Sequence, residues 1–171
     1  MRTKFERNPD LFTIPISNAE FPNNCRDEAP KLLVGLQTIF MEEELNSAVF
    51  SILSKRVNPK QEKLARSGRP GMGLWEILVL GVMRQGLNAN YDRMHYYANS
   101  DRTMRTIMGI ETESGENRKH YGLTTIKDNL ALLDEDTIDQ INNLVVSYGH
   151  NLLKKRRSIP PHKSRFVSSR C

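Results

Sequence analysis

The stretch "MGLWEILVLGVMRQGL", residues 72–87, is the part of the sequence that decides the fold. It is apolar around most of the circumference of a helix, a pattern typical of a helix buried at the centre of a domain. A turn composition, "SGRPG", precedes it at residues 67–71, and Asn88-Ala89-Asn90 follows it. We therefore expect one central helix against which the other elements pack.

Upstream, residues 30 to about 55 carry apolar side chains at helical spacing. The preceding residues, Asp27-Glu28-Ala29-Pro30, form a suitable helix start, with acids at the positive end of the helix dipole and proline in the first turn. These features predict one long helix, on which Glu42-Glu43-Glu44 faces water.

Downstream, "YDRMHYYANSDRTMRTIMGI", residues 91–110, contains two short helical patterns. They are broken at Asn99-Ser100-Asp101 and closed by Gly109. Arg102 and Arg105 are three residues apart on the second pattern, so we expect them to point outward together.

The last third of the chain predicts two more helices. Thr125-Ile126-Lys127-Asp128 fits a capping box at the start of one helix, and Asp134 is suited to cap the other. Apolar residues then form one stripe along the last helix: Ile138, Ile141, Val145, Tyr148 and Leu152. No segment of useful length alternates apolar and polar residues. The predicted fold class is all-α, a small multi-helix domain with helix-turn-helix-like elements.

Three regions follow from these patterns. Residues 1–29, with several prolines and isolated apolar side chains, predict a weakly ordered arm; residues 30–153 predict a helical domain; residues 154–171 lose all periodicity and predict a disordered basic tail. The apolar runs are too short to span a membrane, and no secretory signal opens the sequence. Because the chain has only two cysteines, we expect a cytoplasmic protein without membrane partners.

The net charge of +5 is unevenly distributed along the chain. Residues 154–171 hold seven Lys and Arg residues and no acid, so residues 1–153 sum to −2. Within that body, residues 55–69 contribute +5 and residues 129–153 contribute −4. Positive charge suited to nucleic acid is therefore concentrated in one internal segment and in the tail.

The sequence holds no recognisable active site. The four histidines are far apart and neither cysteine has a nearby partner, so we expect no metal site. We interpret Glu42-Glu43-Glu44 as a solvated helix face and Asp134-Glu135-Asp136 as a helix N-terminus, although either cluster has the oxygen ligands that magnesium takes. No glycine-rich phosphate loop follows a strand. We expect no cofactor and no enzymatic activity.

Side chains suited to DNA binding are more numerous than candidate catalytic or metal-binding groups. A helix-turn-helix unit needs a helix whose first residues reach base edges, with Arg, Lys, Ser or Thr side chains set against phosphates. Three places supply such groups: Arg102 with Arg105; Arg118 and Lys119 running into Thr124, Thr125 and Lys127; and the basic segment that contains Lys60, Lys63, Arg66 and Arg69.

The order of these pieces resembles the N-terminal helical domain of bacterial insertion-sequence transposases with a DDE core. The resemblance covers about residues 30–153 and rests on the apolar helix at 72–87, the "RTIMGI" element at 105–110, and the Thr125-Ile126 helix start. An acidic cap and a long helix then follow. The resemblance implies a region that binds the terminal inverted repeats of a transposon on double-stranded DNA and helps to assemble the transposase.

In that family, catalysis belongs to an RNase H-like core in which three carboxylates hold two metal ions. The sequence of this chain has no strands to build such a core, so the resemblance implies a truncated transposase that binds transposon ends without cutting them. Such a fragment is expected to pair with itself or with an intact transposase. Two alternatives stay open: a helical protein–protein interaction or oligomerisation module, and a non-functional remnant of a transposase gene.

Overall fold

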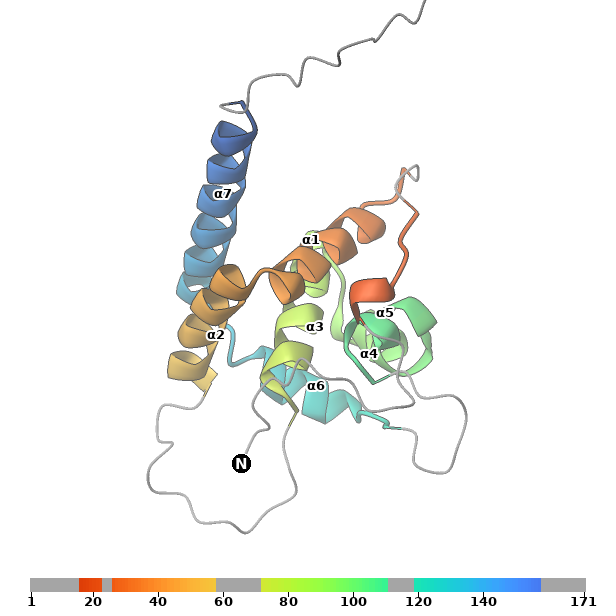
Figure 1. Cartoon of the computed structure of the whole chain (residues 1–171). Helices are drawn as coiled ribbons and strands as arrows, with labels where there is room; N and C mark the ends of the chain where they lie inside the picture. Colours follow the sequence, from red (N-terminus) through yellow and green to blue (C-terminus); the bar gives the residue numbers. More distant parts are fainter. Residues whose placement is uncertain (1–15, 23–25, 58–71, 111–118, 158–171) are drawn as a thin grey trace, which may run out of the picture.

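The computed structural model describes residues 16–22, 26–57, 72–110 and 119–157. In these ranges the chain forms seven α-helices and one short 3-10 turn, without any strand (Figure 1). The elements are η1 (Ile16–Asn18), α1 (Ala29–Met41), α2 (Glu43–Val57), α3 (Leu74–Gly86), α4 (Tyr91–Ser100), α5 (Arg102–Ile107), α6 (Leu123–Leu130) and α7 (Glu135–Arg157). The predicted all-helical fold class is confirmed for the part of the chain described.

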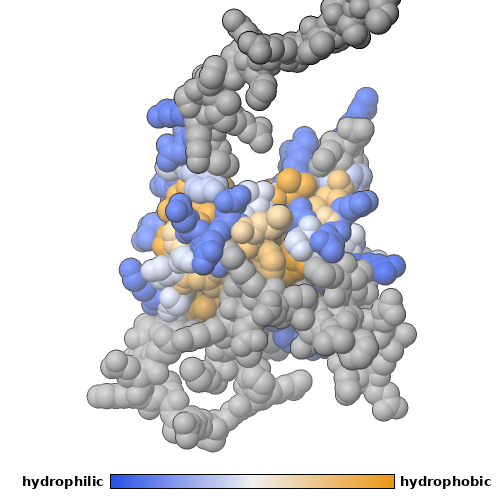
Figure 2. Space-filling view, in the orientation of Figure 1, coloured by the Kyte–Doolittle hydropathy of each residue, from blue (hydrophilic) through white to orange (hydrophobic). Residues whose placement is uncertain are grey.

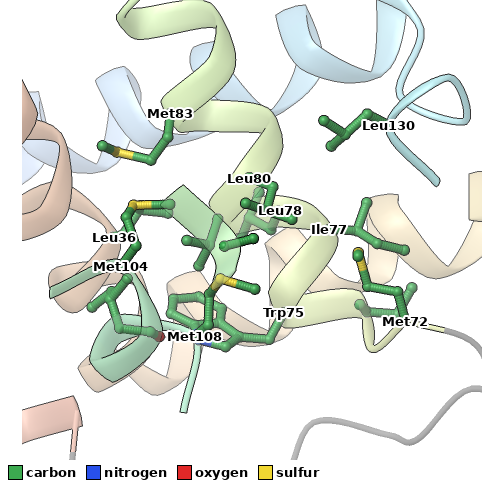
Figure 3. Close-up of a cluster of buried hydrophobic side chains, with 14 of the residues drawn as sticks. Leu36, Met72, Trp75, Ile77, Leu78, Leu80, Met83, Met104, Met108 and Leu130 are labelled. Carbon is green, nitrogen blue, oxygen red and sulfur yellow. Dashed lines mark hydrogen bonds between the residues drawn. The ribbon is translucent and has the colours of Figure 1, made fainter. Parts of the chain in front are cut away.

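Helix α3 is the central helix that its composition predicted. It packs against α1, α2, α4 and α6. The indole of Trp75 lies edge-on to Phe40, with ring centroids 5.5 Å apart, and its N–H donates to the carbonyl of Ile107 at 2.6 Å. In Figure 3, Leu36 of α1 and Met104 of α5 lie beside the side chains of α3. Helix α3 needs no polar face because neighbouring helices cover it on several sides.

The single long helix expected from residue 30 to about 55 is instead two helices. The chain breaks at Glu42, where ψ is 109°, so α1 and α2 meet at an angle (Figure 1). The buried side-chain amide of Asn46 on α2 donates to the carbonyl of Ile39 in the last turn of α1 and so links the two helices across the break. The break lets both helices pack on α3. The expected exposure of residues 42–44 is confirmed.

Helix α7 packs along α2 in the antiparallel direction. Arg56 and Asp134 form an ion pair at 2.9 Å near one end, and the Tyr148 hydroxyl donates to Glu42 at 2.7 Å near the other. Asp134 caps α7 as predicted, accepting the amide of Thr137 at 3.0 Å and also its hydroxyl. The hydroxyl hydrogen bond, followed by that of the amide, holds the pKa of Asp134 below its ordinary value.

At both ends of the domain the ordered structure extends further than the sequence patterns indicated. Helix α7 continues through residues 154–157, for which we predicted a disordered tail. Lys and Arg are good helix formers, so a helix already under way continues through them. In the expected arm, Ile16 is buried, and the Gln37 amide donates to the carbonyls of Ile16 and Ala19 at 2.8 and 2.9 Å.

Two further features of the surface bear on partners. None of the helices described is both long and apolar enough to cross a membrane. On the face in Figure 2, apolar side chains lie among hydrophilic ones over α1 and over the region where α2 and the lower part of α7 lie side by side. The large apolar residues that are most exposed are Met41, Tyr96 and Val146.

Candidate nucleic-acid interface

Arg105, which we expected on the surface, is completely buried. Its guanidinium donates to the carbonyls of Ala98, Lys119 and Ile110 at 3.0–3.1 Å. The prediction that Arg105 points outward beside Arg102 is therefore wrong. Buried carbonyls at the ends of α4 and α5 need donors, and one guanidinium with five N–H groups meets that need. Arg105 is thus a structural residue with no access to a phosphate.

Helix α5 as a whole is poorly placed to read a DNA groove. It has six residues, and the last four, 104–107, are buried. Only Arg102 and Thr103 face solvent. The two tandem helices were correctly predicted, with a break at Asp101, whose side chain accepts the amide of Met104 at 2.7 Å. The exposed surface that they offer is therefore on α4 and at the first turn of α5.

The segment before α6 is fixed to the core by Glu76. This carboxylate, 8% exposed, accepts the Tyr121 hydroxyl at 2.7 Å, the Lys119 ammonium at 2.6 Å and the Gly73 amide at 3.1 Å. Burial, followed by the charge of Glu76, raises the pKa of Tyr121. Lys119, one of the residues predicted to contact DNA, forms an ion pair with Glu76 while its side chain stays 47% exposed.

Asn99 of α4 fixes the same segment from the other side. Its side chain donates to the Tyr121 carbonyl and accepts the Tyr121 amide, both at 2.9 Å. The side-chain amide of Asn99 thus bonds both the N–H and the C=O of Tyr121, as a neighbouring strand would. Because Glu76, Asn99 and Arg105 all hold residues 119–121, the start of α6 has a defined position relative to α3 and α4.

The predicted capping box at Thr125 is wrong, because the N-cap of α6 lies three residues earlier. This N-cap is Gly122, which has an extended backbone and no side-chain cap. The buried Tyr121 and Ile126 set this start, because both side chains must face the core. Thr124, Thr125 and Lys127 are consequently exposed at the first turns of the helix. Among the described residues, the backbone N–H groups of this first turn have no side-chain acceptor, and they lie at the positive end of the helix dipole.

Aromatic and basic side chains surround this helix start. The Arg84 guanidinium lies 4.4 Å from the centroid of the Tyr91 ring, and the Lys127 ammonium lies 5.9 Å from it. The imidazoles of His95 on α4 and His120 lie edge to face, with centroids 5.8 Å apart. Apart from Lys127, sequence spacing did not indicate this group, because its members come from α3, α4, α6 and the segment before α6.

Another basic side chain on α4 was also not predicted as part of a site. The Arg93 guanidinium lies 5.2 Å from the Tyr97 ring centroid, and its Nε donates to the Tyr97 hydroxyl at 2.9 Å. The spacing of four residues on one helix was a signal for this pair.

The remaining predicted contacts lie outside the described residues. They are Arg118 and the four basic residues Lys60, Lys63, Arg66 and Arg69. Of the predicted set, Thr124, Thr125 and Lys127 lie together on α6, and Lys119 is close by in sequence. Arg102 lies apart from them on α5.

Comparison with known proteins adds no family to this picture. The chain matches no protein-family model, no curated protein and no solved structure. The likeness to insertion-sequence transposases therefore stays a prediction from the sequence.

The acidic clusters have structural partners. Glu42 accepts the Tyr148 hydroxyl, and Asp134 caps α7. Among the residues that the structure describes, no three His, Cys, Asp or Glu side chains come together in a way that could hold a metal ion.

Proposed function

We propose that this chain binds double-stranded DNA and that α6 is the helix that meets the groove. The observation that carries the proposal is the exposed start of α6, where Thr124, Thr125 and Lys127 surround uncapped backbone amides. Helix N-termini attract phosphate oxygens through these amides and the dipole, and Thr and Lys side chains add direct phosphate or base contacts.

The surroundings of α6 support this assignment over one to α5. Helix α6 packs on α4, with α3 beneath both, so a three-helix unit presents one short helix to solvent. Helix-turn-helix proteins use such a unit to place the N-terminal residues of one helix against base edges. The network of Glu76, Asn99 and Arg105 makes this placement rigid. Arg93 on α4 and Arg102 on α5 are exposed, and His95 on α4 is half-buried beside His120; these side chains are suited to phosphates.

We further propose that the DNA bound is the terminal inverted repeat of a transposon and that the chain does not cut it. This part of the proposal rests on the resemblance to DDE transposases. A chain of this kind would compete with an intact transposase for the same ends. The other candidate is a helical interaction module; the exposed Met41 and Val146 favour it, because exposed large apolar side chains are typical of protein contacts.

The proposal is tested by fluorescence anisotropy of the chain on labelled duplexes across a salt series. One duplex carries the terminal repeat that flanks the gene, and the other is its scrambled counterpart. We expect at least about tenfold preference for the repeat, equivalent to about 1.4 kcal/mol. The Lys127→Ala variant should bind both duplexes more weakly and lower the slope of log affinity against log salt by about 1.

The matched control is Lys31→Ala, which removes an exposed lysine from α1, a helix that packs on α2 and α3. This variant should retain the slope of the parent chain. Equal slopes for all three proteins, or equal and feeble binding to both duplexes, would refute a DNA site on α6 and favour the interaction module.

A further inference from the structure

Helix α7 is longer than the part of the fold that supports it. Helix α2 accompanies it from the Arg56–Asp134 ion pair to the Glu42–Tyr148 hydrogen bond. Residues 149–157 continue beyond that point, and Figure 1 shows this end of α7 standing clear of the other helices. An isolated helical extension of this length is marginal in water, so a partner surface would stabilise it.

The middle of α7 is unusual for a helix at the surface. Residues 140–153 contain no Asp, Glu, Lys or Arg. Water-facing helix surfaces normally carry charged side chains. Here the exposed positions hold Gln140, Asn142, Asn143, Val146, Ser147, His150 and Asn151. Val146, the central residue of the helix, is 55% exposed. The composition of this face resembles that of a contact surface.

The charged residues of α7 are separated to its two ends. The first two turns carry Glu135, Asp136 and Asp139, all exposed, and the last turn is the basic run at residues 154–157. This arrangement stabilises the helix dipole. It also makes the helix complementary to itself, because an antiparallel copy would place its basic end against the acidic end of the first.

We propose that α7 is a self-association helix, along which a second copy of this chain binds in the antiparallel direction about a two-fold axis near Val146. Asp139 lies seven residues before Val146, and Lys154 eight residues after it. The axis therefore brings Asp139 of one copy beside Lys154 of the other, and this pair occurs twice. Val146 meets its own counterpart, and the neighbouring polar side chains set the register. The helix provides a contact about 34 Å long at 1.5 Å per residue.

Sedimentation equilibrium of the full chain, without DNA, tests this inference separately from DNA binding. We expect a monomer–dimer equilibrium. Asp139→Lys and Lys154→Glu each turn two attractive pairs into repulsive ones, so each variant alone should raise the dimer dissociation constant about tenfold or more. A mixture of the two variants should restore association, because each repulsive pair becomes attractive in the mixed dimer.

The controls carry the same charge changes elsewhere on the surface. Asp92→Lys on α4 and Lys31→Glu on α1 alter exposed residues away from α7 and should dimerise as the parent does. Circular dichroism establishes that each variant is folded. A full chain that stays monomeric throughout would overturn the proposal. Association that neither α7 variant weakens, or that the mixture fails to restore, would overturn it equally.

Discussion

At the scale of single residues, two arginines three positions apart have opposite roles. Arg102 is exposed at the first turn of α5, whereas Arg105 is buried against three carbonyls. Both have the same side chain and both lie on one short helix, so their spacing alone predicted that they face the same way. The three carbonyls that Arg105 bonds come from Ala98, Ile110 and Lys119, and only the folded chain brings these together.

These roles predict different effects on stability. Arg105→Met keeps most of the side-chain volume but leaves buried carbonyls without donors, so we expect it to lower the free energy of unfolding by about 3–5 kcal/mol. Arg102→Met should change it by no more than about 0.5 kcal/mol, as exposed substitutions usually do. Urea denaturation followed by circular dichroism measures both values. Similar losses for the two variants would contradict the structural role assigned to Arg105.

At the scale of elements, close approach between helices depends on glycine at some positions only. A Cβ atom added to Gly86 of α3 would lie 2.4 Å from Cδ1, 2.9 Å from Cδ2 and 3.2 Å from Cγ of Leu32. A Cβ atom added to Gly35 of α1 would meet nothing within 4 Å. The first glycine allows α1 to approach the end of α3, whereas the second has no packing role among the described residues.

Alanine at these two positions should therefore have opposite effects. Gly35→Ala raises helix propensity without a clash and should stabilise the fold by about 0.5–1 kcal/mol. Gly86→Ala forces Leu32 out of its position and should destabilise it by about 1–2 kcal/mol. Thermal or urea unfolding measures both, and Leu32→Ala combined with Gly86→Ala should show less than the summed loss. A stabilising Gly86→Ala would show that Leu32 moves freely.

At the scale of the whole molecule, the positive charge and the proposed binding surface do not coincide. The net charge of +5 owes much to the last residues, whereas the exposed start of α6 belongs to the folded body. Since α7 runs to Arg157, a truncation intended to remove only the tail should end there and not at residue 153. Residues 158–171 carry three Lys and Arg residues and no acid.

Deleting residues 158–171 should weaken DNA binding without abolishing preference for the terminal repeat. Each lost phosphate contact lowers the slope of log affinity against log salt by about 0.9. The slope of the full chain should therefore be steeper than that of residues 1–157 by at most about 3. Anisotropy on the two duplexes measures preference and slope together. Loss of all binding with these residues would mean that the tail alone supplied the affinity, and that α6 serves another purpose.

The local sequence determined most of the elements: the buried α3, the break before α5, the Asp134 cap and the all-helical class. Each depends on contacts within a few residues or on one periodic stripe, which composition and spacing reveal. Gly109, with φ of 70°, closes α5 as its residue type predicted. Tertiary structure alone decided the break at Glu42, since apolar periodicity continues through it and only packing on α3 requires the bend.

The candidate site divides in the same way. Thr124, Thr125 and Lys127 were identifiable because exposed polar residues at a helix start are a local pattern. The burial of Arg105, the ion pair of Lys119 with Glu76 and the Tyr91 contact with Lys127 were not, because each depends on residues of separate elements that only the fold brings together. An ionisable side chain usually faces water and is buried only where hydrogen-bond or ion-pair partners offset its desolvation. Its role is decided by which distant acceptors the fold brings within reach.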